Sequence, residues 1–356
     1  MPPSVCPRFV LPLVMLGLML GCQQSAEPRF AFSTDAPSRT GLVLLEDGVL
    51  VGNEAGRLVR LDVQGRPRWR VELEREIAAS PTVSGESVLV GTVGGTLACL
   101  TLSEGAERWR LTGQPAVLTP LVSDAERVYV VAPDGGVRAV AVDSGEERWR
   151  RPLPPKTPRP ESGRPLPRPL LTGGLLVVAL GDAGLFALSP TDGTVRWRHP
   201  VAQVLGLEAR ADGTLYLSTR QGEVLALGLA TGEVRWRWRH ATTLTSPPSL
   251  ARERLWVGSS DPLLLSLAPE DGRELSRLAL PAPLVAPVSA LRDWLLVPTR
   301  SPQGWLLALP SAEGPPALTL RVDTALLTRP VLVEEQLFVL GQDGRVLSWR
   351  LKPPGP

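Results

Sequence analysis

The sequence predicts an all-β protein folded as an eight-bladed β-propeller, in which each blade is a four-stranded antiparallel sheet. A glycine precedes a tryptophan by four positions in five successive segments. These tryptophans stand at positions 69, 109, 149, 197 and 236, at steps of 40, 40, 48 and 39 residues. Between them lie short apolar or alternating runs separated by turn residues, which is the pattern of β-strands. A period of about 40 residues with several short strands per repeat is typical of a propeller.

The first unit shows the whole pattern. Its four expected strands are residues 42–45, 49–52, 58–61 and 69–73, separated by turns rich in Gly, Asp and Asn. The first strand is short and apolar, as expected for the strand nearest to the axis of the ring. The sixth and seventh units keep the strands but lose the tryptophan, which Ser276 and Leu318 replace.

The eighth unit lacks one strand. Only 330–333, 337–340 and 346–349 follow the strand pattern before the chain reaches its Pro-rich end. Arg29–Thr34 alternates apolar and polar residues, and we expect it to complete this blade as its outermost strand, beside 346–349. Such closure removes an exposed sheet edge. A ring of seven blades stays open as the alternative, if the weak first strand of the fifth unit, 205–210, is not a strand.

A Pro-rich insertion, residues 153–169, separates the third and fourth units and explains the longer step of 48 residues. Its seven prolines favour an extended loop. In a propeller this link shares one face with the second-to-third-strand turns, so we expect it beside the turns at 133–135 and 181–184. Exposed Arg and Leu on a stiff frame suit an interface. The candidate partner-binding residues are therefore Leu153, Arg159, Arg164, Leu166 and Arg168. A tolerated surface insertion is an equally compatible interpretation.

The N-terminal segment predicts export. Arg8 precedes an apolar run of about a dozen residues, which is too short to span a bilayer and fits a signal peptide at residues 1–21. Cys22, directly after Leu20-Gly21, resembles the lipid-modified cysteine of bacterial lipoproteins, although Met19 stands where that motif usually has Leu. We expect a lipid on Cys22, a tether at 22–28 and the propeller at 29–356. By the same resemblance, Gln23 favours the outer membrane. An ordinary signal peptide with an incidental cysteine is the alternative.

The composition excludes some classes of function. A net charge of +2 over 356 residues, with Arg and Glu intermixed, gives no basic stripe that could follow a nucleic acid. Aromatic residues make up 5% and offer no stacking platform for bases. Cys99 stands alone in a strand pattern, and we expect it to be a small core residue. The mature chain then has no internal disulfide.

The segment Gly222–Trp236 resembles the PQQ-like (quinoprotein-type) propeller repeat, which reads Gly-x-Leu-x-Ala-Leu-Asp-x-x-Thr-Gly-x-x-x-Trp. The resemblance extends over 42–350 and implies that each tryptophan packs between adjacent blades as a core residue. With the lipoprotein signal and the tether, the chain resembles the BamB family of outer-membrane assembly lipoproteins. This resemblance implies a non-catalytic scaffold facing the periplasm, which binds periplasmic domains of the barrel-assembly subunit through loops on one face. No motif specific to that family can be matched residue by residue.

The residues also bear on two other classes of function. Quinoprotein dehydrogenases share the repeat, but they carry adjacent cysteines and a calcium site of Glu, Asn and Asp, whereas this chain has no adjacent cysteines and a single Asn, Asn53. His199 and His240 each follow a Trp-Arg pair, at positions that look similar in their repeats, and lack a carboxylate partner for a metal site. The sequence therefore predicts no catalytic, cofactor-binding or metal residue and no enzyme. A ligand- or sugar-binding sensor propeller stays open, and an oxidoreductase that binds PQQ is less favoured.

Overall fold

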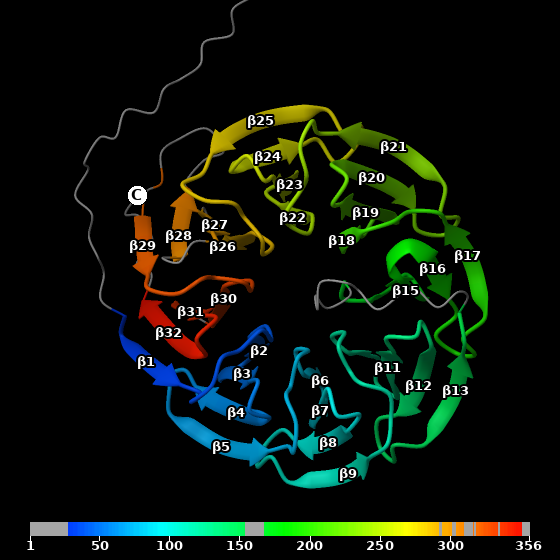
Figure 1. Cartoon of the computed structure of the whole chain (residues 1–356), viewed down its shortest axis with the longest axis vertical. Coiled ribbons are helices and arrows are strands. Elements are labelled where there is room, and N and C mark those ends of the chain that lie inside the picture. Colours follow the sequence, from blue (N-terminus) through cyan, green and yellow to red (C-terminus); the bar gives the residue numbers. More distant parts are fainter. Residues whose placement is uncertain are drawn as a thin grey trace, which may run out of the picture.

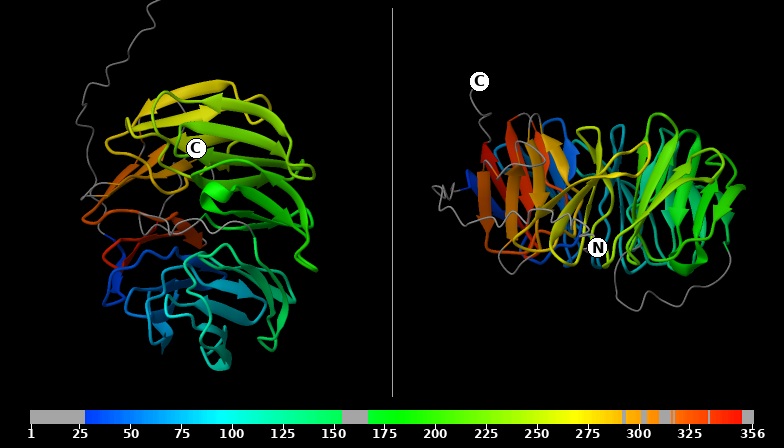
Figure 2. Two further views of the ribbon diagram at one scale, coloured as in Figure 1. Left: turned by 45° about the vertical axis from the view of Figure 1, so that its right-hand side comes forward. Right: turned by 90° about the horizontal axis from the view of Figure 1, so that it is seen from above.

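The computed structural model describes residues 28–153, 167–291, 294–300, 304–309, 316, 318–333 and 335–350. In these segments the strands form eight four-stranded antiparallel sheets, arranged as blades around a common axis (Figure 1). The side view shows the blades standing next to one another in a flat ring (Figure 2). The only helix within these segments is the 3-10 turn η1 (Gly181–Ala183), so none there is long enough to cross a membrane. The predicted fold class is confirmed.

Blades 1 to 4 use consecutive strands from the axis outward. Blade 1 contains β2 (Val43–Leu45), β3 (Gly48–Gly52), β4 (Arg57–Asp62) and β5 (Pro67–Glu72). Blade 2 contains β6 (Thr82–Ser84), β7 (Ser87–Gly91), β8 (Leu97–Thr101) and β9 (Glu107–Leu111). Blade 3 contains β10 (Val122–Ser123), β11 (Arg127–Val131), β12 (Val137–Ala141) and β13 (Glu147–Arg151). Blade 4 contains β14 (Leu170–Thr172), β15 (Leu175–Ala179), β16 (Leu185–Leu188) and β17 (Val195–His199).

Blades 5 to 7 follow the same order, and blade 8 takes one strand from the N-terminal side. Blade 5 contains β18 (Val204–Arg210), β19 (Thr214–Thr219), β20 (Glu223–Gly228) and β21 (Val234–Arg239). Blade 6 contains β22 (Ser249–Ala251), β23 (Arg254–Gly258), β24 (Leu263–Leu267) and β25 (Glu274–Ala279). Blade 7 contains β26 (Ser289–Leu291), β27 (Trp294–Pro298), β28 (Gly304–Leu309) and β29 (Leu318–Val322). Blade 8 contains β30 (Val331–Val333), β31 (Gln336–Leu340), β32 (Arg345–Arg350) and β1 (Phe30–Ser33). Because β18 is a full strand, the alternative of seven blades is wrong.

The repeated tryptophans connect neighbouring blades, as the sequence predicted. The indole N–H of Trp69 in blade 1 donates to the Leu102 carbonyl of blade 2 at 2.9 Å. Its ring covers Gly105 of blade 2, where an added Cβ would come within 2.8 Å of the ring and where φ is +71°. Each tryptophan thus packs against the glycine of the next blade, not the one four positions before it. The other pairs are Trp109 with Gly145, Trp149 with Gly193, Trp197 with Gly232, and Trp236 with Gly272.

The ring closes through the N-terminal strand, which confirms the predicted pairing. Strand β1 runs antiparallel to β32, with Phe30 opposite Ser348. The Phe30 ring meets Phe338 edge to face, with centroids 5.7 Å apart. A Cβ at Gly65 of blade 1 would come within 2.4 Å of the Phe30 ring. Phe30 therefore occupies the place in blade 8 that a tryptophan occupies in blades 1 to 5.

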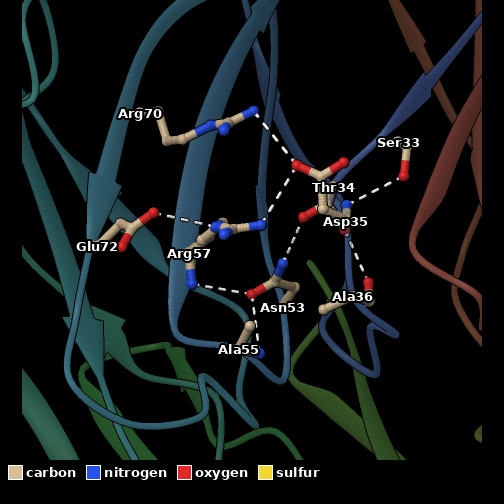
Figure 3. Close-up of polar contacts among 9 residues, drawn as sticks. All are labelled: Ser33, Thr34, Asp35, Ala36, Asn53, Ala55, Arg57, Arg70 and Glu72. Atoms are coloured by element: carbon tan, nitrogen blue, oxygen red, sulfur yellow. Dashed lines mark hydrogen bonds and ion pairs between the residues drawn. The ribbon is translucent and has the colours of Figure 1, made fainter.

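Polar contacts also hold the segment after β1 against blade 1 (Figure 3). Asn53, which is fully buried, donates from Nδ2 to the Thr34 carbonyl at 2.7 Å, and its Oδ1 accepts from the backbone N–H of Arg57 at 2.8 Å. Arg57 lies between two carboxylates, 3.3 Å from Asp35 and 3.1 Å from Glu72. The N-terminal segment is thereby attached to both blades that meet at the closing point.

Candidate functional site

One face of the ring carries the links between blades, and we call it the link face. Val137, where β12 begins, pairs with Arg151, where β13 ends, so the link that leaves blade 3 starts beside the turn before β12. A Cβ at Gly135 in that turn would lie 3.5 Å from the Leu153 carbonyl and 3.9 Å from the Leu180 side chain of blade 4. The start of the insertion therefore lies between the two turns, as predicted. The opposite face, which carries the first-to-second and third-to-fourth turns, is the turn face.

Of the five predicted partner-binding residues, the structure describes Leu153 and Arg168. Leu153 is only 7% exposed and packs in the core with Leu180, so the expectation that it is an exposed interface anchor is wrong. Arg159, Arg164 and Leu166 lie outside the described residues, as does the predicted lipidation site Cys22. Arg168 is described and exposed, directly before Pro169 and β14. The role of this set in partner binding stays a prediction.

The register places Arg168 and Arg329 at the same repeat position. Leu170 is opposite Val177 in blade 4, and Val331 is opposite Phe338 in blade 8. Each arginine precedes this paired residue by two positions and is followed by proline. The other blades place small residues or proline here, namely Gly41, Ser80, Pro120, Gly206, Pro247 and Pro287.

The innermost strand of blade 5 carries a carboxylate, Glu208. Glu208 is a half-buried residue of β18, and it faces Tyr216 in the register. We call Arg168, Glu208 and Arg329 the axial cluster, because all three lie on or directly before innermost strands. Within the described residues, none of their side chains has a hydrogen bond or ion pair to another side chain. Sequence reasoning missed the cluster, although its signal is simple: charged residues at inner-strand positions where other blades have small or apolar ones.

Burial shifts the pKa of two of these three groups. Burial among surrounding atoms lowers the pKa of the Arg168 guanidinium, and the positive charge of Arg329 lowers it further. Burial raises the pKa of the Glu208 carboxyl, whereas Arg329 works in the opposite direction. Arg168 nevertheless stays accessible to water. A side chain can have many protein atoms around it and still contact water where strands from several blades converge around an axis that water can enter.

A cleft lies on the turn face between blades 2 and 3. This cleft has a volume of about 740 Å³, and its lining includes Arg108, Arg127 and Arg148. These cations already have partners: Arg108 donates to Ser87 at 2.8 Å, Arg127 lies 2.9 Å from Glu126, and Arg148 lies 2.9 Å from Glu146. The cleft therefore presents internally compensated charge and no strong preference for an anion.

The histidines form no metal site in the part of the chain that the structure describes, where no three His, Cys, Asp or Glu side chains are placed to hold a metal ion. His240 is 7% exposed, stacks on Trp238 with ring centroids 5.6 Å apart, and lies 3.4 Å from Asp261. The expectation that His199 and His240 are equivalent is wrong. His199 follows the blade-joining Trp197 by two positions, whereas His240 follows Trp236 by four, because Trp238 repeats the Trp-Arg-His pattern two residues later.

Cys99 is confirmed as a core residue. It is fully buried in blade 2, and burial raises the pKa of its thiol, against smaller opposing effects of Ser87 and Arg108.

The sequence matches known proteins. The family model described as outer membrane protein assembly factor BamB matches residues 54–206 and 202–275. The curated outer membrane protein assembly factor BamB of Bordetella pertussis is 30% identical over 150 residues, covering 41% of this chain and 39% of that protein. The BamB of Nitrosomonas eutropha is 30% identical over 241 residues, covering 64% of this chain and 46% of that protein. The matched segments thus span less than half of these relatives.

Solved structures share the fold. BamB from Moraxella catarrhalis has a TM-score of 0.73 and 18% identity, covering 92% of this chain and 98% of that one. The quinohemoprotein alcohol dehydrogenase of Comamonas testosteroni has a TM-score of 0.73 and 11% identity, covering 92% of this chain and 78% of that one. The computationally designed Ika8 protein has a TM-score of 0.74 and 14% identity, covering 90% and 98%. Proteins of such different kinds show that these likenesses establish the architecture alone. The family match covers more than half of the chain, and the chain belongs to the family described as outer membrane protein assembly factor BamB.

Proposed function

We propose that this protein is a non-catalytic scaffold of the bacterial cell envelope that takes part in outer-membrane protein assembly. In this proposal a lipid on Cys22 anchors it to the outer membrane, and the propeller faces the periplasm. Its link face binds the periplasmic domains of the outer-membrane barrel-assembly subunit. The observation that carries the proposal is the match to the BamB family over residues 54–275, together with the closed eight-bladed ring that contains this segment.

The polar residues of the repeat support a structural role. The Asp62 carboxylate accepts from the backbone N–H groups of Gln64 and Arg66, both at 2.9 Å. Asp134 accepts in the same way from Gly136 at 2.9 Å, and Asp343 from Arg345 at 3.1 Å. Such contacts shape turns. The turns therefore account for these three aspartates.

Binding through the insertion can be tested by affinity capture of the tagged full-length chain from cells that contain the barrel-assembly subunit. The variant is Arg159→Ala/Arg164→Ala/Leu166→Ala, which leaves Arg168 unchanged. Its control is Arg273→Ala, because Arg273 is 72% exposed in the β24–β25 turn on the opposite face. We expect the triple variant to recover at least tenfold less of the assembly subunit, since exposed Arg and Leu anchors carry much of an interface, and the control to recover as much as wild type. Equal recovery by all three would remove the insertion as the binding site, and no recovery by wild type would contradict the scaffold proposal.

The anchor is tested separately by feeding cells a labelled fatty acid. Wild type should incorporate the label and fractionate with the outer membrane, because one or more acyl chains supply membrane affinity that a polar tether lacks. Cys22→Ala should lose both the label and the membrane association. A Cys22→Ala protein labelled as strongly as wild type would show that the lipid site lies elsewhere.

A further inference from the structure

One buried charge in blade 3 departs from the repeat. Arg138 lies on β12, the third strand of the blade, and is only 5% exposed. It directly precedes Ala139, which pairs with the blade-joining Trp149, and it pairs itself with Arg150 on β13. The residue at this position is apolar in each of the other blades: Val59, Ala98, Phe186, Leu225, Leu265, Leu307 and Leu347. The fold therefore does not require a charge here.

The Arg138 side chain lies between blades 2 and 3, which stand side by side in the ring (Figure 1). Its cross-strand partner Val130 and Val140, two positions later, lie on the same face of the sheet and belong to the core cluster that joins these blades. One nitrogen, Nη1, donates to the side-chain oxygen of Gln114, which lies in the link from blade 2 to blade 3. The other two, Nε and Nη2, are buried and have no hydrogen-bond partner among the described residues.

This guanidinium has no carboxylate partner in the part of the chain that the structure describes. The nearby Glu147 is bound by Arg150, 2.7 Å away. Burial lowers the pKa of Arg138, and the charge of Arg150 lowers it further, against the opposing effect of Glu147. Like charges directly opposite in two strands destabilise a sheet, and an unpaired buried charge is also destabilising. An anion beside Arg138 would offset both effects.

The two unpartnered nitrogens indicate which anion fits. In a guanidinium group the N–H of Nε and one N–H of Nη2 are parallel and lie on the same edge. This edge matches the two oxygens of a carboxylate, each of which accepts one hydrogen bond. A carboxylate also carries a single negative charge, which balances one buried guanidinium. A phosphate dianion would leave an uncompensated negative charge at the same place.

Gln114 separates Arg138 from the link face. The backbone N–H of Gln114 donates to the Gly95 carbonyl at 3.0 Å, in the turn between β7 and β8, and such second-to-third-strand turns lie on this face. The Gln114 side chain is half-buried, and its Nε2 donates to the Thr112 carbonyl at 3.2 Å in an exposed contact. A neutral amide therefore covers Arg138 and occupies only one of its nitrogens.

We propose that Arg138 binds the carboxylate of an Asp or Glu side chain from a protein that docks on the link face over blades 2 and 3. The Gln114 side chain swings away, and the acidic side chain takes its place against the guanidinium. The depth of the site suits this source, because a single half-buried side chain separates Arg138 from the surface.

This inference rests on the proposed function, since it names a group that the link face recognises in its partner. The position also borders the insertion. Arg151, which ends β13, pairs with Val137, directly before Arg138. The insertion begins at Leu153, two residues after Arg151. A protein that binds the insertion would therefore extend over Gln114 with a short reach.

Affinity capture tests the contact with the partner. The tagged full-length Arg138→Leu chain should recover at least about tenfold less of the barrel-assembly subunit than wild type, because a buried charge pair across the interface is lost. Its matched control is Arg150→Leu, which removes the same charge from the facing position, where the side chain is 57% exposed, and should recover as much as wild type. Equal recovery by Arg138→Leu and wild type, or an equal loss in both variants, would overturn the proposal.

Thermal unfolding separates loss of binding from loss of fold. Arg138→Leu replaces an unpaired buried charge by the residue that blades 5 and 6 have at this position. It should therefore unfold at the same temperature as wild type or at a higher one. A lower melting temperature would show that the charge supports the fold, and the argument for a bound carboxylate would be lost.

A carboxylate placed on the chain itself tests the site without the partner. Gln114→Glu keeps the shape of the side chain, and its hydrogen bond to Arg138 becomes charge-assisted. We expect a higher melting temperature than that of wild type, and no such rise when the same change is made in Arg138→Leu. An equal effect in both backgrounds would overturn the proposal. Because this measurement needs no partner, it decides on the site even if wild type recovers no subunit, a result that would contradict the proposed function.

The same variants link the site to docking. Gln114→Glu should recover less of the subunit than wild type, because its own carboxylate occupies Arg138. Gln114→Ala removes the cover without adding a charge and should recover at least as much as wild type. Full recovery by Gln114→Glu would show that the partner does not use Arg138.

Acetate distinguishes a free anion from a side chain. Melting temperatures of wild type and Arg138→Leu are compared in sodium acetate and in sodium chloride of equal ionic strength. We expect at most a slight rise in acetate, since a free ion has to displace Gln114 without help from other contacts. A large rise in wild type that Arg138→Leu lacks, together with unchanged capture of the subunit by Arg138→Leu, would assign the site to a free carboxylate and overturn the docking proposal.

Discussion

Blades 1 to 5 end in a strand whose tryptophan covers a glycine of the next blade, whereas blades 6 to 8 are joined by other means. In blade 6 the tryptophan position holds Ser276, which hydrogen-bonds to Ser266 of the neighbouring strand at 2.6 Å. Blade 6 instead buries Trp256 on its second strand, in the row where Trp256, Ser266 and Ser276 stand side by side. In blade 8 the same row contains Phe338 and Phe30.

The comparison shows what the repeat requires. In blades 5, 6 and 8, the residues that pair side by side across the strands include at least one large side chain that fills the space between blades. This side chain is not always on the outermost strand. In blade 5 the row contains both Tyr216 and Trp236, whose rings lie 5.9 Å apart. In blade 6 a single Trp256 on the second strand takes over part of this role. The tryptophan of the repeat can therefore be replaced while the packing between blades is kept.

Deletion of residues 29–34 should have the largest effect, because it leaves the closing blade open. The deletion removes Phe30 with its contacts to Phe338 and Gly65. We expect a loss of about 5 kcal/mol and a melting temperature lower by roughly 5–10 °C. Differential scanning calorimetry of the deletion and of wild type measures it. An unchanged transition would show that β1 is not needed for closure.

Trp197→Ala should cost more than the matched change in blade 6. Trp197 is 9% exposed, and its indole N–H donates to the Leu229 carbonyl at 2.8 Å. We expect a loss of about 3–5 kcal/mol, as for other buried aromatic residues. Ser276→Ala removes only one hydrogen bond and should cost about 1 kcal/mol. Urea unfolding of both variants gives the two values. Equal losses would contradict the distinction between the two groups of blades.

Two glycines separate the effect of the tryptophan contact from that of backbone strain. Gly232 and Gly213 have φ of +72° and +77°, but an added Cβ at Gly232 would come within 2.6 Å of Trp197, whereas one at Gly213 meets nothing within 4 Å. Gly213→Ala should therefore cost about 1–2 kcal/mol for its backbone conformation alone. Gly232→Ala should cost roughly 1–3 kcal/mol more, because it overpacks the junction between blades. The same unfolding measurement decides, and similar losses would mean that the Trp197 ring moves aside freely.

The smallest expected effect depends on pH and concerns blade 6. Burial acts to raise the pKa of Asp261, but the nearby Ser259 hydroxyl and hydrogen bonds from Thr242, its own backbone N–H and His240 outweigh it and bring the pKa to about 2. An unfolded Asp has a pKa of about 3.9, so the ionised group stabilises the fold above that value, and the contribution is lost as the pH falls from about 4 to about 2. Because Asp261 is 42% exposed, we expect at most about 1 kcal/mol.

Asp261→Asn tests this linkage. The difference in unfolding free energy between variant and wild type should be present at pH 6 and should shrink between pH 4 and pH 2. A difference that stays constant over this range would show that ionisation of Asp261 does not contribute.

Much of the fold could be predicted because its signals are local. Each Gly–Trp pair and each short apolar run repeats at a fixed period, and the pairing of residues 29–34 with 346–349 follows from a missing strand. The partner of each tryptophan could not be predicted in the same way. Trp69 packs against Gly105, and not against Gly65, because the contact depends on how neighbouring blades stack, which no single repeat encodes.

The candidate site was less predictable for the same reason. The sequence presents Leu153 and Arg168 as similar ends of one insertion, but the turns of blades 3 and 4 bury the first and leave the second exposed. Arg168 and Arg329 are far apart in the sequence, and only the register with Val177 and Phe338 shows that they hold equivalent positions. Charged residues that hold equivalent positions only in the folded ring are hard to recognise in the sequence.

The closing strand also has a consequence for how the protein is made. Among the described strands β1 is synthesised first, and its partner β32 is synthesised last. During synthesis β1 therefore appears before its partner exists, and blades 1 to 7 can form while their ring is still open. Contacts between such distant parts of a chain form slowly, and an unpaired strand edge is prone to misassociation while it waits. A chaperone that prevents misassociation should therefore act mainly between the synthesis of β1 and the synthesis of β32.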